Sequence, residues 1–257
     1  MNTGVSIRAI PGVPDIAPGD DLAAILGNCL EAGGGLADGD IITVAHKVVS
    51  KAEGNVVDLD TVAPSEEAIR IAGELNKNPA KVDVVLGQSS RVVRAFKRPD
   101  QDEGTLICEH RLGFISANAA VDESNADGDN TVITLPEDPD ASARRLGRAL
   151  EDRFGVTLGV VITDTFGRPW RLGQVNVAIG LYRVPAKTSD IGGTDAWGRP
   201  LSVTEPALSD ELAAASGLVV AKAAKTPLVL IRGVAWQAAE QTSARDILRA
   251  SKEDMFR

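Results

Sequence analysis

The spacing of apolar residues predicts four helices in the body of this chain, and residues 243–257 are expected to form a last short helix and tail. Between Asp21 and Gly33, apolar positions recur every three or four residues, which is the pattern of an amphipathic helix with a start and a stop signal. The same spacing predicts helices over 65–75, 137–154 and 209–222. Ser65 is suited to capping the first of these, as is Asp140 for the second. Gly155 is expected to stop the helix that Asp140 opens.

Short runs of β-branched and apolar residues predict the strands. The run 160–162 ends abruptly on polar residues, so Asp164 is expected at the end of a buried strand. Further strands are expected at 41–51, 82–86, 105–108 and 227–233. A loop-rich segment, 180–206, interrupts this pattern with several glycines and prolines. An irregular segment of that length is usually functional, and a binding lid is one interpretation.

The segment VVITDTFGRPWRLGQ, residues 160–174, carries the richest chemistry. Asp164 and Thr165 offer oxygen ligands for a metal ion, and Arg168 and Arg171 offer guanidinium groups suited to phosphate or carboxylate. The alternative, a capped loop with arginines on the surface, stays open at this point.

A second group of oxygen donors follows the small residues of LGFISANAAVDESN, where Asp122, Glu123 and Asn125 come together. Asp122 and Asp164 could share one or two hard cations such as Mg²⁺ or Mn²⁺, although both could simply cap turns. Lys51 could neutralise a phosphate, although an exposed structural lysine is the commoner case.

Composition narrows the function classes. The chain has 257 residues, of which 44% are hydrophobic, and its formal net charge is -9. These values are typical of one large globular domain or two closely joined ones, and the negative charge argues against a nucleic-acid surface. The sequence has no apolar stretch long enough to cross a membrane and no signal peptide at its start, so a cytoplasmic protein is expected.

Several common site types are excluded or disfavoured. With only two histidines and two cysteines, a histidine-based triad, a zinc site and a disulfide framework are improbable. Neither the GxxxxGK[ST] loop nor the GxGxxG fingerprint occurs, so a nucleotide would bind without a P-loop or Rossmann motif.

Five segments in series resemble the coenzyme F420-0:L-glutamate ligase family, the gamma-glutamyl ligases of deazaflavin coenzyme biosynthesis. They are IPGVPDIAPGDDL, GDIITVAHKVVSKAEG, EHRLGF with AAVDESN, ITDTFGRPWRLGQ, and SDELAAASGLV. The resemblance implies an α+β fold of mixed β-sheets with flanking helices over residues 1–257, without a C-terminal nitroreductase-like extension. It also implies a homodimer with the site near the subunit interface.

The resemblance implies a GTP-dependent reaction with two divalent cations, Mg²⁺ or Mn²⁺. GTP phosphorylates the lactyl carboxylate of F420-0, and the amine of L-glutamate then attacks the acyl phosphate. Asp122 and Asp164 match metal ligands and Thr165 a neighbouring ligand to the second metal, while Asp164, Arg168 and Arg171 are the expected catalytic residues. The matching nucleotide contacts are Val13, Pro14, Asp15, Ile16, Lys51 and Asn125.

The chain departs from the family pattern at several positions. His46 stands where relatives often carry Ser or Gln, and is kept as a candidate nucleotide contact. Lys222 stands in place of a Gln metal ligand; an ammonium cannot coordinate a cation, so a phosphate contact is expected instead. Asn176 replaces an acidic residue, and the segment after it is also unusual. Two alternatives therefore stay open: a ligase for another carboxylate acceptor, and a catalytically silent nucleotide- or metabolite-binding protein.

Overall fold

A five-stranded sheet forms the centre of the protein. The computed structural model describes residues 4–123, 130–220 and 225–254. The sheet has the order β1 (Ser6–Ile10), β10 (Leu228–Arg232), β2 (Ile41–Ala45), β8 (Gly159–Arg168) and β9 (Arg171–Tyr182). Only the β2–β8 pair is parallel, and the others are antiparallel.

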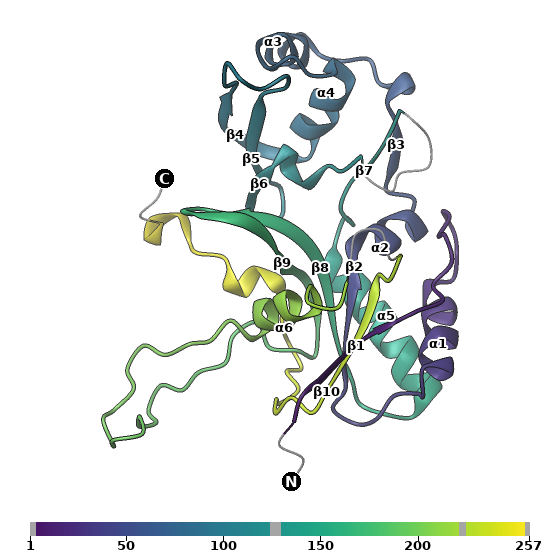
Figure 1. Ribbon diagram of the computed structural model, residues 1–257, viewed down its shortest axis with the longest axis vertical. Coiled ribbons are helices and arrows are strands. Elements are labelled where there is room, and N and C mark those ends of the chain that lie inside the picture. Colours follow the sequence, from purple (N-terminus) through teal and green to yellow (C-terminus); the bar gives the residue numbers. More distant parts are fainter. Residues whose placement is uncertain (1–3, 124–129, 221–224, 255–257) are drawn as a thin grey trace.

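Helices cover both faces of this sheet, which explains why its inner strands are continuously apolar. α1 (Leu22–Ala32), α2 (His46–Ala52) and α5 (Pro139–Phe154) pack on one face, and α6 (Leu208–Ser216) packs on the other (Figure 1). Successive side chains of a strand point to opposite faces, so Val160 and Ile162 belong to the core under α5 while Val161 belongs to the core under α6.

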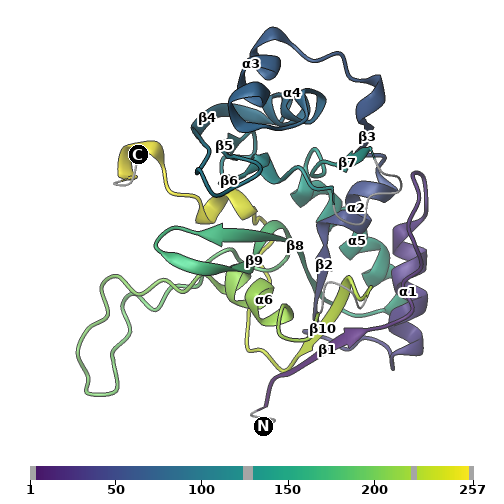
Figure 2. The ribbon, with the colours of Figure 1, turned by 45° about the horizontal axis from the view of Figure 1, so that its top comes forward.

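A second group of elements has a hydrophobic core of its own and lies at one end of the central sheet (Figures 1 and 2). Its helices are α3 (Glu66–Leu75) and α4 (Pro79–Gly87). Its strands are β4 (Ser89–Phe96), β5 (Thr105–His110) and β6 (Ile115–Ala117), which form one sheet, and β3 (Val56–Asp58) and β7 (Thr131–Ile133), which form another. Short 3₁₀ helices η1 (Leu59–Thr61) and η2 (Asn118–Ala120) connect them. The mixed α+β fold expected from the sequence is confirmed.

Two of the expected strands are wrong. The run 82–86 belongs to α4, where Asn78 caps the helix, Pro79 occupies its first turn, and Val82 and Val85 share a buried face three residues apart. Since this apolar run is short, its periodicity cannot distinguish a buried strand from a buried helix. The run 41–51 is a strand only as far as Ala45, after which α2 begins.

The helix over 137–154 is confirmed, including its stop at Gly155, but its cap is Asp138 rather than Asp140. The carboxylate of Asp138 accepts a hydrogen bond from the Ala141 amide at 2.9 Å. Asp140 instead accepts from the Leu181 amide of β9 at 2.8 Å, so it connects the helix to the sheet. The expected helix from Ser209 begins one residue earlier and ends at Ser216.

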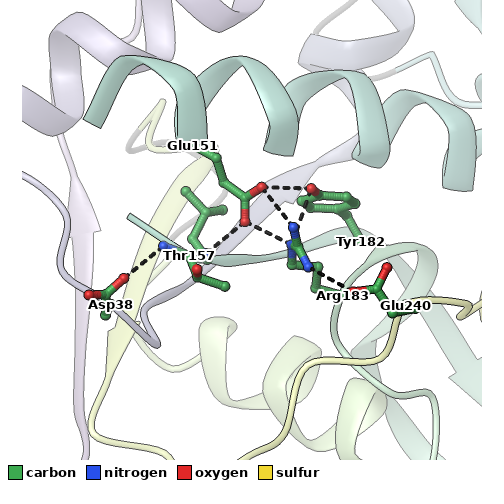
Figure 3. Close-up of polar contacts among 7 residues, drawn as sticks. Asp38, Glu151, Thr157, Tyr182, Arg183 and Glu240 are labelled. Carbon is green, nitrogen blue, oxygen red and sulfur yellow. Dashed lines mark hydrogen bonds and ion pairs between the residues drawn. The ribbon is translucent and has the colours of Figure 1, made fainter. Parts of the chain in front are cut away.

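The expected loop-rich segment 180–206 begins later than predicted, because β9 continues to Tyr182. Residues 183–207 form neither helix nor strand and extend away from the body of the protein (Figure 1). A polar network anchors the start of this segment (Figure 3). The Tyr182 hydroxyl donates to Glu151 Oε2 at 2.7 Å, and Arg183 Nε lies 2.8 Å from Glu151 Oε1. The segment therefore leaves the sheet at a position fixed against α5.

Candidate functional site

Strand pairing in the central sheet brings four segments that are distant in sequence together at one end of the strands. β2 and β8 are parallel, and Ala45 pairs with Thr163, so the residues that follow each strand's buried part lie side by side. β10 is antiparallel to β2 and therefore begins at this end of the strands, where the Ala45 amide donates to the Pro227 carbonyl oxygen at 2.8 Å. β1 ends there too, because Ile10 pairs with Leu228.

A cavity of about 470 Å³ opens at this end of the strands. Its lining includes nine of the residues expected from the sequence: Val13, Pro14, Asp15, Ile16, His46, Lys51, Asp122, Asp164 and Thr165. Asp122 comes from the second group of elements, where its backbone pairs with Ile133, the last residue of β7. The fold thus gathers residues separated by about 150 positions into one cavity.

Asp164 is not at a strand end, which corrects the sequence-based expectation. β8 continues to Arg168 and forms a hairpin with β9, so Asp164 lies inside a strand at the point where the buried part gives way to the cavity. His46 Nε2 lies 3.3 Å from Asp164 Oδ1, at ion-pair distance but without hydrogen-bond geometry. His46 is buried, and its Nδ1 lies 3.3 Å from the Ser50 hydroxyl.

Lys47 also lines the cavity; it lies with Lys51 in the run 41–51, whose lysines are candidates for contacting a phosphate from the sequence alone. The Nζ of Lys47 lies 2.6 Å from Asp122 Oδ2. Lys47 and Lys51 are four positions apart on α2, so they share a helix face. Had the run after Ala45 been interpreted as a helix, this spacing would have indicated two lysines directed at one site.

Lys225 also lines the cavity and was not expected there from the sequence. Its Nζ lies 3.0 Å from Asp15 Oδ1, which joins the N-terminal loop to the segment before β10. The hydrogen bond and charge of Lys225, with a smaller contribution from Lys51, hold the pKa of Asp15 below its usual value. The cavity therefore contains three lysines and three aspartates among the residues that line it.

Hydrogen bonds between polar side chains link the two strands of the hairpin to each other and to the end of α6. The Thr165 hydroxyl donates to Asn176 Oδ1 at 2.9 Å, and Asn176 Nδ2 donates to the Ser216 hydroxyl at 3.3 Å. Asn176 and Gln174 both line the cavity, so β9 adds amide oxygens to the carboxylates of the site. Thr165 and Asn176 pair across the two strands, and this register fixes their contact.

Arg168 and Arg171 lie apart from these residues. Both are exposed at the turn of the hairpin, and neither lines the cavity. Arg168 Nη2 donates to the Leu172 carbonyl oxygen at 3.0 Å, which closes the turn on itself. Two other expected residues, Asn125 and Lys222, lie outside the described residues.

The donors around the cavity fit a hard divalent cation. Asp122 and Asp164 supply carboxylates, and Thr165, Gln174 and Asn176 supply neutral oxygens, which are the ligands that Mg²⁺ and Mn²⁺ prefer. Within the described ranges, no cluster of three or more His, Cys, Asp or Glu side chains is assembled for a metal. Lys47 Nζ lies beside Asp122 and His46 Nε2 beside Asp164, so a cation would have to share or replace these contacts.

The chain was compared with known proteins. A model of the F420-0:Gamma-glutamyl ligase family matches residues 12–233. A protein of Methanothermobacter thermautotrophicus named coenzyme F420:L-glutamate ligase is 40% identical over 257 residues, with 99% of each chain covered. A protein of the same name from Methanopyrus kandleri is 43% identical over 255 residues, covering 98% of this chain and 97% of the relative.

The family match spans parts of both the central sheet and the second group of elements, and it includes every residue that lines the cavity. Among the described residues, no helix is long and apolar enough to span a membrane. Since both the family model and relatives above 35% identity cover nearly the whole chain, the protein belongs to the F420-0:gamma-glutamyl ligase family.

Proposed function

We propose that this protein is a GTP- and divalent-metal-dependent ligase that adds L-glutamate to the lactyl carboxylate of coenzyme F420-0. One observation carries the proposal: lysines and oxygen donors from distant segments line a single cavity in a member of this family. Relatives that cover nearly the whole chain are named coenzyme F420:L-glutamate ligase, which supports the same acceptor and amino acid.

In the proposed reaction, an oxygen of the acceptor carboxylate attacks the γ-phosphorus of GTP, and GDP leaves. The amine of glutamate then attacks the acyl carbon and loses a proton, and phosphate leaves as the amide forms. Lys47, Lys51 and Lys225 are suited to holding the phosphates, because fixed ammonium groups stabilise charge that moves from GTP to the departing phosphate.

Asp122, Asp164 and Thr165 would hold the divalent cations, with Asn176 orienting the Thr165 hydroxyl. When bound, such a cation polarises phosphoryl oxygens and offsets their negative charge. Because the carboxylates come from two different groups of elements, their separation depends on how Asp122 is held by Lys47 and by the backbone of Ile133. The N-terminal loop with Val13, Pro14, Asp15 and Ile16 would close the nucleotide side of the cavity.

We propose that Arg168 and Arg171 assist from outside the cavity. Their guanidinium groups are exposed at the hairpin turn, where they can attract the anionic substrates or contact a charged part that extends beyond the cavity. A role in charge stabilisation at the reacting phosphate would need the turn to reach the site of a second subunit.

A homodimer is part of the proposal. Several large apolar side chains are exposed on the hairpin turn and on the segment 183–207, namely Trp170, Leu172, Ile191, Trp197 and Val203. Side chains of this kind on projecting segments are typical of association surfaces. Light scattering after gel filtration should give the mass of two chains, and a mass of one chain would contradict the dimer.

The experiment that tests the function is mass spectrometry of the purified protein with F420-0, L-glutamate, GTP and Mg²⁺ or Mn²⁺, with GDP release followed in parallel. Each component is omitted in turn. A mass gain of glutamyl units coupled to GDP is the expected result, and ATP in place of GTP tests the nucleotide.

Asn176 favours a second candidate, a ligase of the same mechanism for a different carboxylate acceptor. Its side chain lines the cavity on the strand that leads into the projecting segment 183–207. Nucleotide hydrolysis without a glutamylated F420 product would support this candidate. Absence of both would leave the binding-protein alternative.

A further inference from the structure

A second cavity, of about 510 Å³, lies against the same hairpin. β9 forms one wall, and the beginnings of α5 and α6 and the 3₁₀ helix η3 (Ala244–Ile247) form the others. None of the residues around the first cavity lines this one. Its volume is within the range of pockets that hold small organic molecules.

Aromatic rings build one side of this cavity. Phe114 and Phe166 line it, and their ring centroids are 4.7 Å apart. His110 stacks behind Phe114 with a centroid distance of 4.9 Å and is fully buried. Burial, together with the charge of Arg111, lowers the pKa of His110 to about 4, so this ring is neutral at neutral pH. The wall is therefore aromatic and uncharged.

Charged groups occur at other sides of the cavity. Arg144 from α5 and Arg245 from η3 line it, and within the described part of the chain neither guanidinium has an ion-pair partner. Asp210 accepts a hydrogen bond from the Ala178 amide at 2.9 Å, and burial raises the pKa of its carboxyl. Two further carboxylates of the lining, Asp138 and Asp140, accept hydrogen bonds from the backbone amides of Ala141 and of Leu181 and Ala244. An aromatic wall, two arginines without such partners and three carboxylates that accept hydrogen bonds from the backbone suit a flat heteroaromatic ring that carries an anionic group.

Partly buried hydrogen bonds to Asp140 hold η3 beside this cavity. Asp140 Oδ2 accepts from the Ser243 hydroxyl at 2.6 Å, and Asp140 Oδ1 accepts from the Ala244 amide at 3.1 Å. Because the same carboxylate also holds the Leu181 amide, Arg245 is carried on a segment fixed to both α5 and β9. The position of η3 beside the cavity is therefore fixed by the hydrogen bonds of Asp140 to both η3 and β9.

We propose that the second cavity binds the planar ring system of an anionic heteroaromatic ligand, which on the function proposed above is the deazaflavin ring of the acceptor. Thr165 lines the first cavity and Phe166 lines the second, and these residues are consecutive in β8. β9 is the edge strand of the sheet, so a ligand can pass around it from one cavity to the other. The ring would then lie in the second cavity while the carboxylate reaches the lysines and aspartates of the first. This identification rests on the proposed function.

The test is equilibrium dialysis with F420-0 and, separately, with riboflavin 5′-phosphate, a tricyclic ring with an anionic group, both without nucleotide. Three variants are compared with the wild type: Phe166→Leu removes a ring of the wall, Arg245→Gln removes an exposed charge with little risk to folding, and Phe96→Leu is the control. Phe96 is a half-buried phenylalanine of β4 that lines neither cavity.

Phe166→Leu and Arg245→Gln should each weaken binding of F420-0 about tenfold, the scale of one lost stacking or charged contact, while Phe96→Leu binds as the wild type does. The affinity for GTP should stay unchanged in all three. Equal affinity of all variants for F420-0, or no binding of either probe to the wild type, would overturn the proposal. Binding that the two variants weaken, in a protein that makes no glutamylated product, would uphold the cavity and reject the proposed function.

Discussion

The base and the turn of the β8–β9 hairpin carry neighbouring parts of one sequence motif but differ in almost every physical respect. At the base, Asp164 is largely buried, with 11% of its side chain exposed, and lies beside His46. At the turn, Trp170 is 86% exposed and Leu172 is 98% exposed. The motif TDTFGRPWR therefore divides between a cavity and a projecting tip.

The difference shows that proximity in sequence is a poor guide to proximity in a site. A strand rises about 3.3 Å per residue, so four residues carry Arg168 more than 10 Å along the strand from Asp164. Lys47, which is 117 positions from Asp164 in sequence, lines the same cavity because β2 and β8 are parallel neighbours. The following variants test whether the function follows the base or the turn.

The largest effect is expected for Asp164→Asn. Removal of this carboxylate should lower metal-dependent turnover by at least about a thousandfold, because a charge that stabilises the cation is lost. The shape of the side chain is kept, so thermal unfolding should change little. GDP release at saturating Mn²⁺ is the measurement, and Asp190→Asn in the exposed segment is the matched control. Near-normal turnover of Asp164→Asn would reject the metal site.

The next effect concerns the stack behind the hairpin base. His110 has a pKa of about 4 in the folded protein and an ordinary value of 6.5, so the unfolded chain binds more protons between these values. Stability from this group is therefore complete above pH 6.5 and falls as the pH decreases towards 4, by about 3 kcal/mol in all. Urea unfolding of the wild type and of His110→Gln across this window should show a shallower pH dependence in the variant. Parallel curves would contradict the assignment.

Lys51→Met should produce a smaller effect, confined to the nucleotide. Loss of one ammonium from a phosphate site is expected to raise the KM for GTP about 10- to 100-fold. Met preserves the length and the apolar stem of the side chain, which is buried. Lys97→Met, on the exposed connection between β4 and β5, is the control. An unchanged KM for GTP would remove Lys51 from the nucleotide site.

The smallest effect is expected at the turn. Arg171→Ala should lower kcat/KM by less than about tenfold, mainly at low ionic strength, because an exposed guanidinium acts through screened, long-range attraction. The salt dependence of kcat/KM for the variant and the wild type is the measurement. A loss as large as that of Asp164→Asn would show that the arginines act at the reacting phosphate, and would argue that the turn enters the site of a second subunit.

Much of the local structure could be predicted from the sequence, because it depends on residues close together in the chain. Ser65 caps α3 and Gly155 ends α5 in the left-handed conformation, as their residue types indicated. The failures occurred where two local signals competed. In α4, Val82 to Leu86 satisfies both a buried strand and a buried helix, and only its packing against the second core decides between them.

The sequence by itself determined the family and the mixed α+β fold, and it supplied the oxygen and lysine side chains of the candidate site, because these follow from residue types and from motifs in series. Tertiary structure alone decided which of those residues share a cavity. It added Lys225 and Gln174, and left Arg168 and Arg171 outside. The physical reason is strand pairing: side-by-side placement of β1, β10, β2 and β8 depends on hydrogen bonds between segments far apart in the chain, which no local pattern records.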